Sequence, residues 1–140
     1  MGQQRIEIDK EFPFPVSDLF EHLSEHENLS ALFAPVKARR VKQGDVEPNG
    51  VGSVRRMSLP LAPAFEETVT EFERDQRIAY RITKGSPLRD HHGVMLFSET
   101  AAGSRLHYTI VFKGKLPLIA ALIKPALERS IRKGLDDLRL

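Results

Sequence analysis

Hydrophobic and polar positions follow a period of two at the start of the chain and then change to a helical period. Ile6 and Ile8 alternate with charged neighbours, which predicts a strand. Between Val16 and Leu23 the apolar residues recur at i, i+3, i+4 and i+7, so they share one face of a helix. A second short helix is expected at about residues 27–33, because Pro35 disfavours helical backbone in the residue before it.

The middle of the chain, from Val36 to Phe112, alternates between short apolar–polar segments and turn residues. Gly, Pro, Asn and Asp gather between the segments, for example in DVEPNG and TAAGS. Six successive strands joined by short turns predict an antiparallel meander. The segments are VKARRVKQG, VGSVRRMSL, FEETVTEFE, RIAYRITKG, HHGVMLFSE and RLHYTIVFKGK.

The chain ends in LPLIAALIKPALERSIRKGLDDLRL, which predicts a long helix from about residue 116 onwards. Pro125 lacks an N–H group, so we expect a kink there. The half before this proline is apolar nearly all round and is expected to be buried on several sides. Beyond it, apolar residues form one stripe between residues 127 and 138. Helices on one face of an antiparallel sheet give an α+β fold.

Composition limits the possible functions. The 140 residues suit a single domain, residues 1–140, and the absence of cysteine excludes disulfides, thiolate metal sites and cysteine nucleophiles. The N-terminus carries no signal peptide pattern, so a cytoplasmic location is expected. The most apolar stretch, residues 116–123, is too short for a membrane span, which needs about 20 residues.

Charge is balanced overall but uneven along the chain. The net charge is +2, with acidic residues concentrated in residues 1–35 and basic residues in residues 36–60 and 91–140. This distribution falls short of the dense basic stripe that nucleic-acid binding needs, so no nucleic-acid partner is expected.

The order of elements and several stretches of sequence resemble the START-like (SRPBCC) superfamily, which includes polyketide cyclases, birch-pollen-type allergens and coenzyme Q-binding proteins. The stretches that carry this resemblance are FPFPVSDLFEHLSEHENLSALFAPV, GVGSVRRMSL, FEETVTEFERDQRIAYRI, GSRLHYTIVF and ALERSIRKGLDDL. The resemblance implies a helix-grip fold, in which a curved antiparallel sheet of about seven strands wraps around the long C-terminal helix. It also implies a pocket for an apolar ligand between the helix and the sheet.

Strand alternation indicates which side chains face that pocket. It places Tyr80 and Tyr108 inward, and Met57 inward on the same face as Arg55. Alternation does not decide which side chains face inward in FEETVTEFE and HHGVMLFSE, because apolar residues occur at both odd and even positions. The resemblance favours Phe65, Glu67 and Val69 inward in the first segment, and His92, Val94 and Leu96 inward in the second.

A small polar set on an apolar concave face is typical of a small-molecule site. In an alternative interpretation, the Arg and Glu of this set satisfy each other and the tyrosine hydroxyls reach water. The candidate polar contacts are Arg55, Glu67, Tyr80, His92 and Tyr108; the candidate apolar contacts are Phe33, Met57, Val69, Leu96 and Leu122.

Three functions fit these residues. The first is binding of a small hydrophobic ligand such as a lipid, quinone, polyketide or aromatic metabolite, without a cofactor and without catalysis, by a monomer or homodimer. The second is a polyketide or aromatic cyclase or dehydratase that uses His92, Glu67 and Tyr80 for acid–base chemistry. The third is a protein-interaction module that uses the outer face of the sheet or the PLAPA loop.

Two further patterns have ordinary explanations. HLSEH, from His22 to His26, fits the H-x-x-E-H zinc pattern, but its helix is short and no third ligand is evident. We therefore expect solvated histidines and no metal site. The basic side of the C-terminal helix permits a transient membrane-surface contact, although a pocket lid is the favoured role of this helix.

Overall fold

The structure, a computed structural model, describes residues 2–85, 88–116 and 118–140. A seven-stranded antiparallel sheet and three α-helices make up an α+β fold. The strands are β1 (Gln4–Phe12), β2 (Lys37–Lys42), β3 (Val54–Ser58), β4 (Phe65–Glu73), β5 (Arg77–Lys84), β6 (Leu88–Thr100) and β7 (Gly103–Gly114). The helices are α1 (Val16–Ser24), α2 (Leu29–Leu32) and α3 (Ile119–Asp136), with a short 3₁₀ turn, His26–Asn28, before α2.

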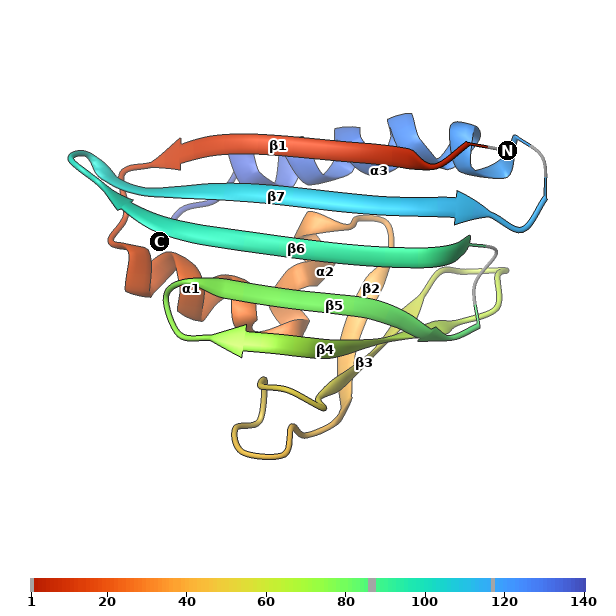
Figure 1. Cartoon of the computed structure of the whole chain (residues 1–140), viewed down its shortest axis with the longest axis horizontal. Helices are drawn as coiled ribbons and strands as arrows, with labels where there is room; N and C mark the ends of the chain where they lie inside the picture. The colour runs from red at the N-terminus through yellow and green to blue at the C-terminus, as the bar shows by residue number, and fades with distance from the viewer. Residues whose placement is uncertain (1, 86–87, 117) are drawn as a thin grey trace.

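The sheet confirms the predicted meander. Its order is β1-β7-β6-β5-β4-β3-β2, so β1 joins the edge beside β7 and every other neighbour is consecutive in sequence. Figure 1 shows the three helices behind one face of the sheet, with β2 and β3 curving towards them. The arrangement is the helix-grip fold that the resemblance implied.

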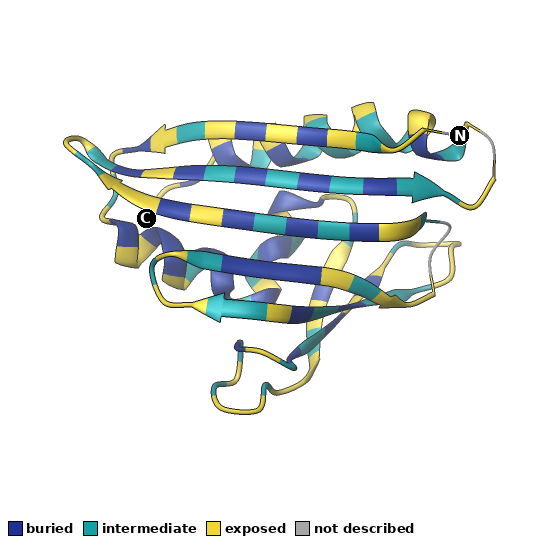
Figure 2. Ribbon diagram, in the orientation of Figure 1, coloured by how far each residue is buried: buried dark blue, intermediate teal, exposed yellow. Residues whose placement is uncertain are grey.

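Alternating burial along the strands defines the inner face, and Figure 2 shows it as alternating dark and light bands. In β4 the predicted orientation is confirmed, since Glu67 and Val69 are buried. A register shift between Val69 and Glu71 then turns Phe72 towards α1, where its ring lies 5.2 Å from that of Phe20.

In β6 the predicted orientation is wrong. Met95 and Phe97 are buried, whereas Leu96 is 39% exposed and His92 lies on the outer face with it. Both parities of this strand carry apolar residues, and the larger side chains at 95 and 97 take the interior because they bury more apolar area. His91 lies on the same face of the strand as Met95 and Phe97 and is also buried.

The C-terminal helix α3 contacts β1, β7 and α2. Gly134 permits the close approach to α2, because a Cβ there would lie 2.9 Å from the Cα of Leu32. Pro125 lies inside the helix, as predicted. The first half of the helix is not buried on several sides, however, since Leu122 is 71% exposed and the neighbouring Ala121 is exposed as well.

Candidate functional site

A cavity of about 590 Å³ lies between α3 and the concave face of the sheet. Its volume is in the range of small-molecule pockets. The wall is apolar except for three polar side chains, which come from β4, β5 and β6. The lining residues are Phe33, Val36, Met57, Leu59, Ala62, Pro63, Phe65, Glu67, Tyr80, Ile82, Leu88, His91, Ile110, Ile123 and Leu127.

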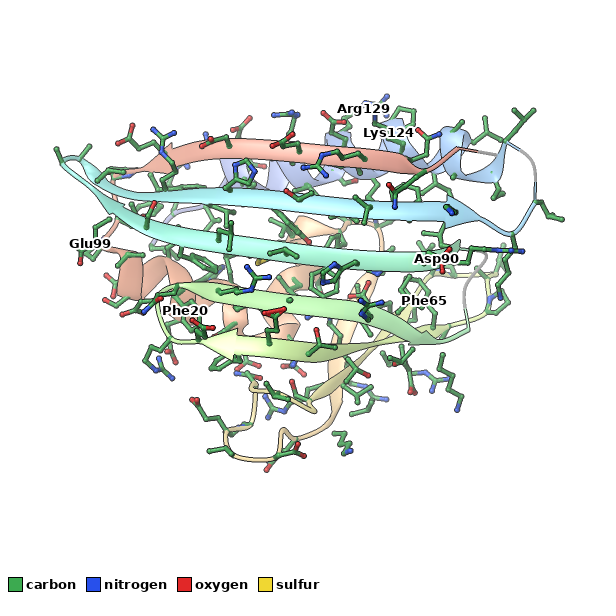
Figure 3. The ribbon with its side chains drawn as sticks, in the orientation of Figure 1. Phe20, Phe65, Asp90, Glu99, Lys124 and Arg129 are labelled. Atoms are coloured by element: carbon green, nitrogen blue, oxygen red, sulfur yellow. The ribbon has the colours of Figure 1, made fainter. Side chains whose placement is uncertain are left out.

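The cavity reaches the surface beside the β3–β4 loop. Ala62 and Pro63 line the cavity and are also exposed to solvent. Phe65, labelled in Figure 3, lies at the start of β4 on the same side of the molecule. From the opposite wall, α3 contributes Ile123 and Leu127. An apolar ligand would therefore lie between the loop and the helix.

A buried ion pair supports the polar end of the cavity. Arg55 and Glu67 are paired across β3 and β4, and Arg55 Nε donates to Glu67 Oε1 at 2.7 Å. Their side chains are only 3% and 6% exposed. Burial alone would lower the pKa of Arg55, but attraction to the Glu67 carboxylate outweighs it and the pKa is raised. The guanidinium also lies over the Tyr80 ring, 4.4 Å from its centroid.

His26 lies behind this ion pair. Arg55 Nη1 can only donate, so His26 Nδ1 accepts at 3.1 Å and Nε2–H donates to Ser53 Oγ at 3.0 Å. Burial first, and then the positive charges of Arg55 and Arg40, lower the pKa of His26 to about 3. The expectation of a solvated histidine at this position is wrong, because the ring is fully buried and hydrogen-bonded to Ser53 and Arg55.

His91 faces the cavity in a fixed tautomer. The backbone N–H of Ile82 donates to His91 Nδ1 at 3.2 Å, so the neutral ring carries its proton on Nε2. Nε2 lies 3.8 Å from Oε2 of Glu67. Burial lowers the pKa of His91 more than the Glu67 carboxylate raises it, so the ring is neutral near pH 7.

Two tyrosine hydroxyls complete the polar cluster. Tyr80 and Tyr108 share a short hydrogen bond. Burial is the main reason that the pKa of each is raised above its usual value, so both keep their protons. Gly93 makes the position of Tyr80 possible, because a Cβ at residue 93 would overlap the phenol ring.

The structure divides the candidate residues from the sequence into three groups. Phe33, Met57, Glu67 and Tyr80 line the cavity. Arg55, Val69 and Tyr108 are buried but do not line it. His92, Leu96 and Leu122 point away from it, which corrects their predicted orientation.

His91 is the polar residue that the sequence reasoning missed. The sequence held a partial signal, because His91 lies on the same face of the strand as Met95 and Phe97, whose side chains are together larger than those of Val94 and Leu96 on the other face.

Metal binding and membrane spanning find no support in the described part of the chain. No group of three or more His, Asp or Glu side chains there is arranged so that it could hold a metal ion. None of the helices there has the length and apolar character required to cross a bilayer.

A curved antiparallel sheet closed by a long C-terminal helix around a mostly apolar cavity defines the START-like class of helix-grip proteins. The family model described as "Polyketide cyclase / dehydrase and lipid transport" matches residues 3–140, and the chain belongs to this family. No curated protein matches the sequence.

Solved structures agree with the fold. The Zhui aromatase/cyclase from Streptomyces sp. R1128 is 15% identical, with a TM-score of 0.71 over 99% of this chain and 97% of that one. Ara h 8.0201 is 15% identical, with a TM-score of 0.65 over 97% of this chain and 100% of the other. Protein Ms6760 from Mycobacterium smegmatis is 17% identical, with a TM-score of 0.64 over 94% and 88%. At these identities the likeness concerns the fold alone.

Proposed function

We propose that this protein binds a small hydrophobic molecule in the cavity between the sheet and α3. The observation that carries the proposal is the cavity of about 590 Å³, whose apolar wall the protein's own side chains leave unfilled. The family description, which includes lipid transport, is in keeping with this role. A lipid, a quinone and an aromatic metabolite all match the character of the wall.

Two neighbouring residues on α3 allow a direct test. Ile123 lines the cavity, whereas Leu122 is exposed. A tryptophan at residue 123 fills part of the cavity, so Ile123→Trp should weaken binding of the fluorescent probe 1-anilinonaphthalene-8-sulfonate by about tenfold or more. Leu122→Trp should leave the affinity unchanged. Equal affinities of the two variants would contradict the proposed location.

Two exposed apolar residues that are adjacent in sequence to lining residues are our candidates for the ligand's access route. Leu61 in the β3–β4 loop is fully exposed, and Leu122 on α3 is largely exposed. Figure 3 shows Lys124 and Arg129 along the same helix, at the outer edge of the molecule. If the ligand is a lipid, we propose that this part of the surface contacts a membrane transiently during ligand exchange. Vesicles of anionic lipid should then bind the wild type more tightly than Leu122→Ser.

A cyclase or dehydratase activity is the second candidate. The observation that favours it is the pairing of a neutral histidine, His91, with the carboxylate of Glu67 on the cavity wall. These groups, with Tyr80, could move protons during ring closure of a bound polyketone. The test is product formation from a polyketone, which should fall strongly in His91→Asn and remain in His92→Asn. Unchanged turnover in His91→Asn would exclude this role for the histidine.

A further inference from the structure

Glu67 presents a hydrogen-bond acceptor to the cavity and His91 presents a donor. Contacts with other residues fix these two roles. Arg55 Nε occupies Oε1 of Glu67, which leaves Oε2 as the acceptor on the cavity side. The N–H of Ile82 occupies Nδ1 of His91, which leaves Nε2–H as a donor. The cavity wall therefore carries one donor and one acceptor side by side.

These two atoms are 3.8 Å apart. This distance exceeds that of a normal N–H···O hydrogen bond, which is about 2.7–3.2 Å, so the two groups do not satisfy each other directly. A single oxygen atom beside both can accept from Nε2–H and donate to Oε2. Both residues lie on the cavity wall, so a ligand that covers these atoms without hydrogen-bonding to them would leave a buried donor and acceptor unsatisfied, which is costly.

The geometry restricts the chemistry of the ligand's polar group. A hydroxyl both accepts and donates, so it satisfies His91 and Glu67 together. An ether oxygen accepts from His91 but leaves Glu67 Oε2 without a donor. A carboxylate has no donor and adds a second negative charge beside Glu67. Arg55 does not line the cavity. Its Nε and Nη1 are bonded to Glu67 and His26, and its Nη2, which has no hydrogen-bond partner among the described residues, is buried, so Arg55 offers the ligand no exposed donor.

We propose that the site selects apolar molecules that carry a hydroxyl group, an alcohol or a phenol, whose oxygen bridges His91 Nε2 and Glu67 Oε2. This assignment rests on the proposed binding function and names the class of ligand. The apolar body of the ligand lies against the remainder of the wall, towards Ile123 and Leu127.

Three probes with one ring system test the assignment: 2-naphthol, 2-methoxynaphthalene and 2-naphthoate. Isothermal titration at pH 7 should give roughly tenfold tighter binding of 2-naphthol than of 2-methoxynaphthalene, the effect of one buried hydrogen-bonding pair. The anionic 2-naphthoate should bind more weakly than 2-naphthol. Equal affinities of the first two probes, or the tightest binding for 2-naphthoate, would overturn the assignment.

Substitutions at two adjacent histidines separate the hydrogen bond from general packing. In His91→Asn, the amide oxygen can still accept from Ile82 N–H, but no donor remains at the position of Nε2. The preference for 2-naphthol should disappear, while the affinity for 2-methoxynaphthalene should change little. The matched control is His92→Asn on the outer face, which should keep the preference. His91→Gln, whose amide nitrogen can reach the position of Nε2, should restore part of it.

The outcomes distinguish this inference from the proposed function. If the apolar probes bind but His91→Asn keeps the full preference for 2-naphthol, the hydroxyl assignment fails and the binding function stands. Thermal unfolding of each variant shows whether it is folded, and His91→Gln provides the same comparison if His91→Asn unfolds. If no naphthalene probe binds and 1-anilinonaphthalene-8-sulfonate does not bind either, the binding function fails and takes the assignment with it.

Discussion

Acidification should destabilise the fold through His26, by an amount that the structure allows us to calculate. The ring is fully buried and accepts a hydrogen bond from the guanidinium of Arg55 at His26 Nδ1. A proton on Nδ1 would break this bond and place two positive charges in contact. The folded protein therefore resists protonation of His26, whereas the unfolded chain does not.

The sign and size follow from the two pKa values. Burial, reinforced by Arg55, lowers the pKa of His26 from its usual 6.5 to about 3 in the folded state. Between these values the unfolded state binds one more proton than the folded state, so stability falls as the pH falls through 6.5 towards 3. The loss is about 1.4 kcal/mol per pH unit within this window. Between pH 7 and pH 5, His26 should thus cost about 2 kcal/mol of unfolding free energy.

Urea unfolding of the wild type and of His26→Gln, each at pH 7 and pH 5, measures this contribution. The variant removes the titrating group, so its loss of unfolding free energy on acidification should be about 2 kcal/mol smaller than that of the wild type. His92→Gln, on the partly exposed outer face, should reduce the loss much less. An equal loss in the wild type and His26→Gln would refute the assignment of His26 as a buried neutral acceptor.

Three other predictions concern the interior of the protein. Arg55→Met leaves a buried carboxylate without its partner and should cost about 3–5 kcal/mol in urea unfolding, whereas Arg56→Met on the exposed side of the same strand should cost less than about 1 kcal/mol. Phe97→Ala should cost about 3–5 kcal/mol and Leu96→Ala far less; similar values would contradict the orientation of β6. Gly93→Ala should displace the phenol ring of Tyr80 and so lower both the melting temperature and the affinity for 1-anilinonaphthalene-8-sulfonate. Wild-type values for both would show that the Tyr80 ring can move without cost.

The elements and their order could be predicted from the sequence because each depends on local patterns. Apolar residues spaced three and four apart gave the helix from Val16, and turn residues between alternating segments gave the strands. The exposure of Leu122 could not be predicted in this way. Helical periodicity shows which residues share a face, but it does not show how many faces of α3 the remainder of the protein covers.

The polar part of the site could be predicted only in part. Arg55, Glu67 and Tyr80 follow from strands whose alternation, or whose resemblance to the family, gave the correct face. β6 carries apolar residues at both odd and even positions, and its register with β7 shifts between Arg89 and His92. Alternation alone therefore could not show that His91 faces the cavity. The burial of His26 depends on contacts with Ser53 and Arg55, which are distant in sequence and come together only in the folded sheet.

The distribution of packing explains how one small domain holds both a stable core and a cavity. At the α1 end, aromatic rings from three elements fill the interior, and the Phe20 ring lies 5.0 Å from that of Phe97. At the other end, α3 rests on β1, β7 and α2, so the space above β3–β5 is not filled by the helix. Glu67 and His91 lie on the wall of that space, and Arg55 is buried against Glu67; a buried ion pair is often no more stabilising than an apolar replacement of similar volume. A buried ion pair beside an unfilled cavity is the arrangement that the proposed recognition of a ligand's hydroxyl group requires.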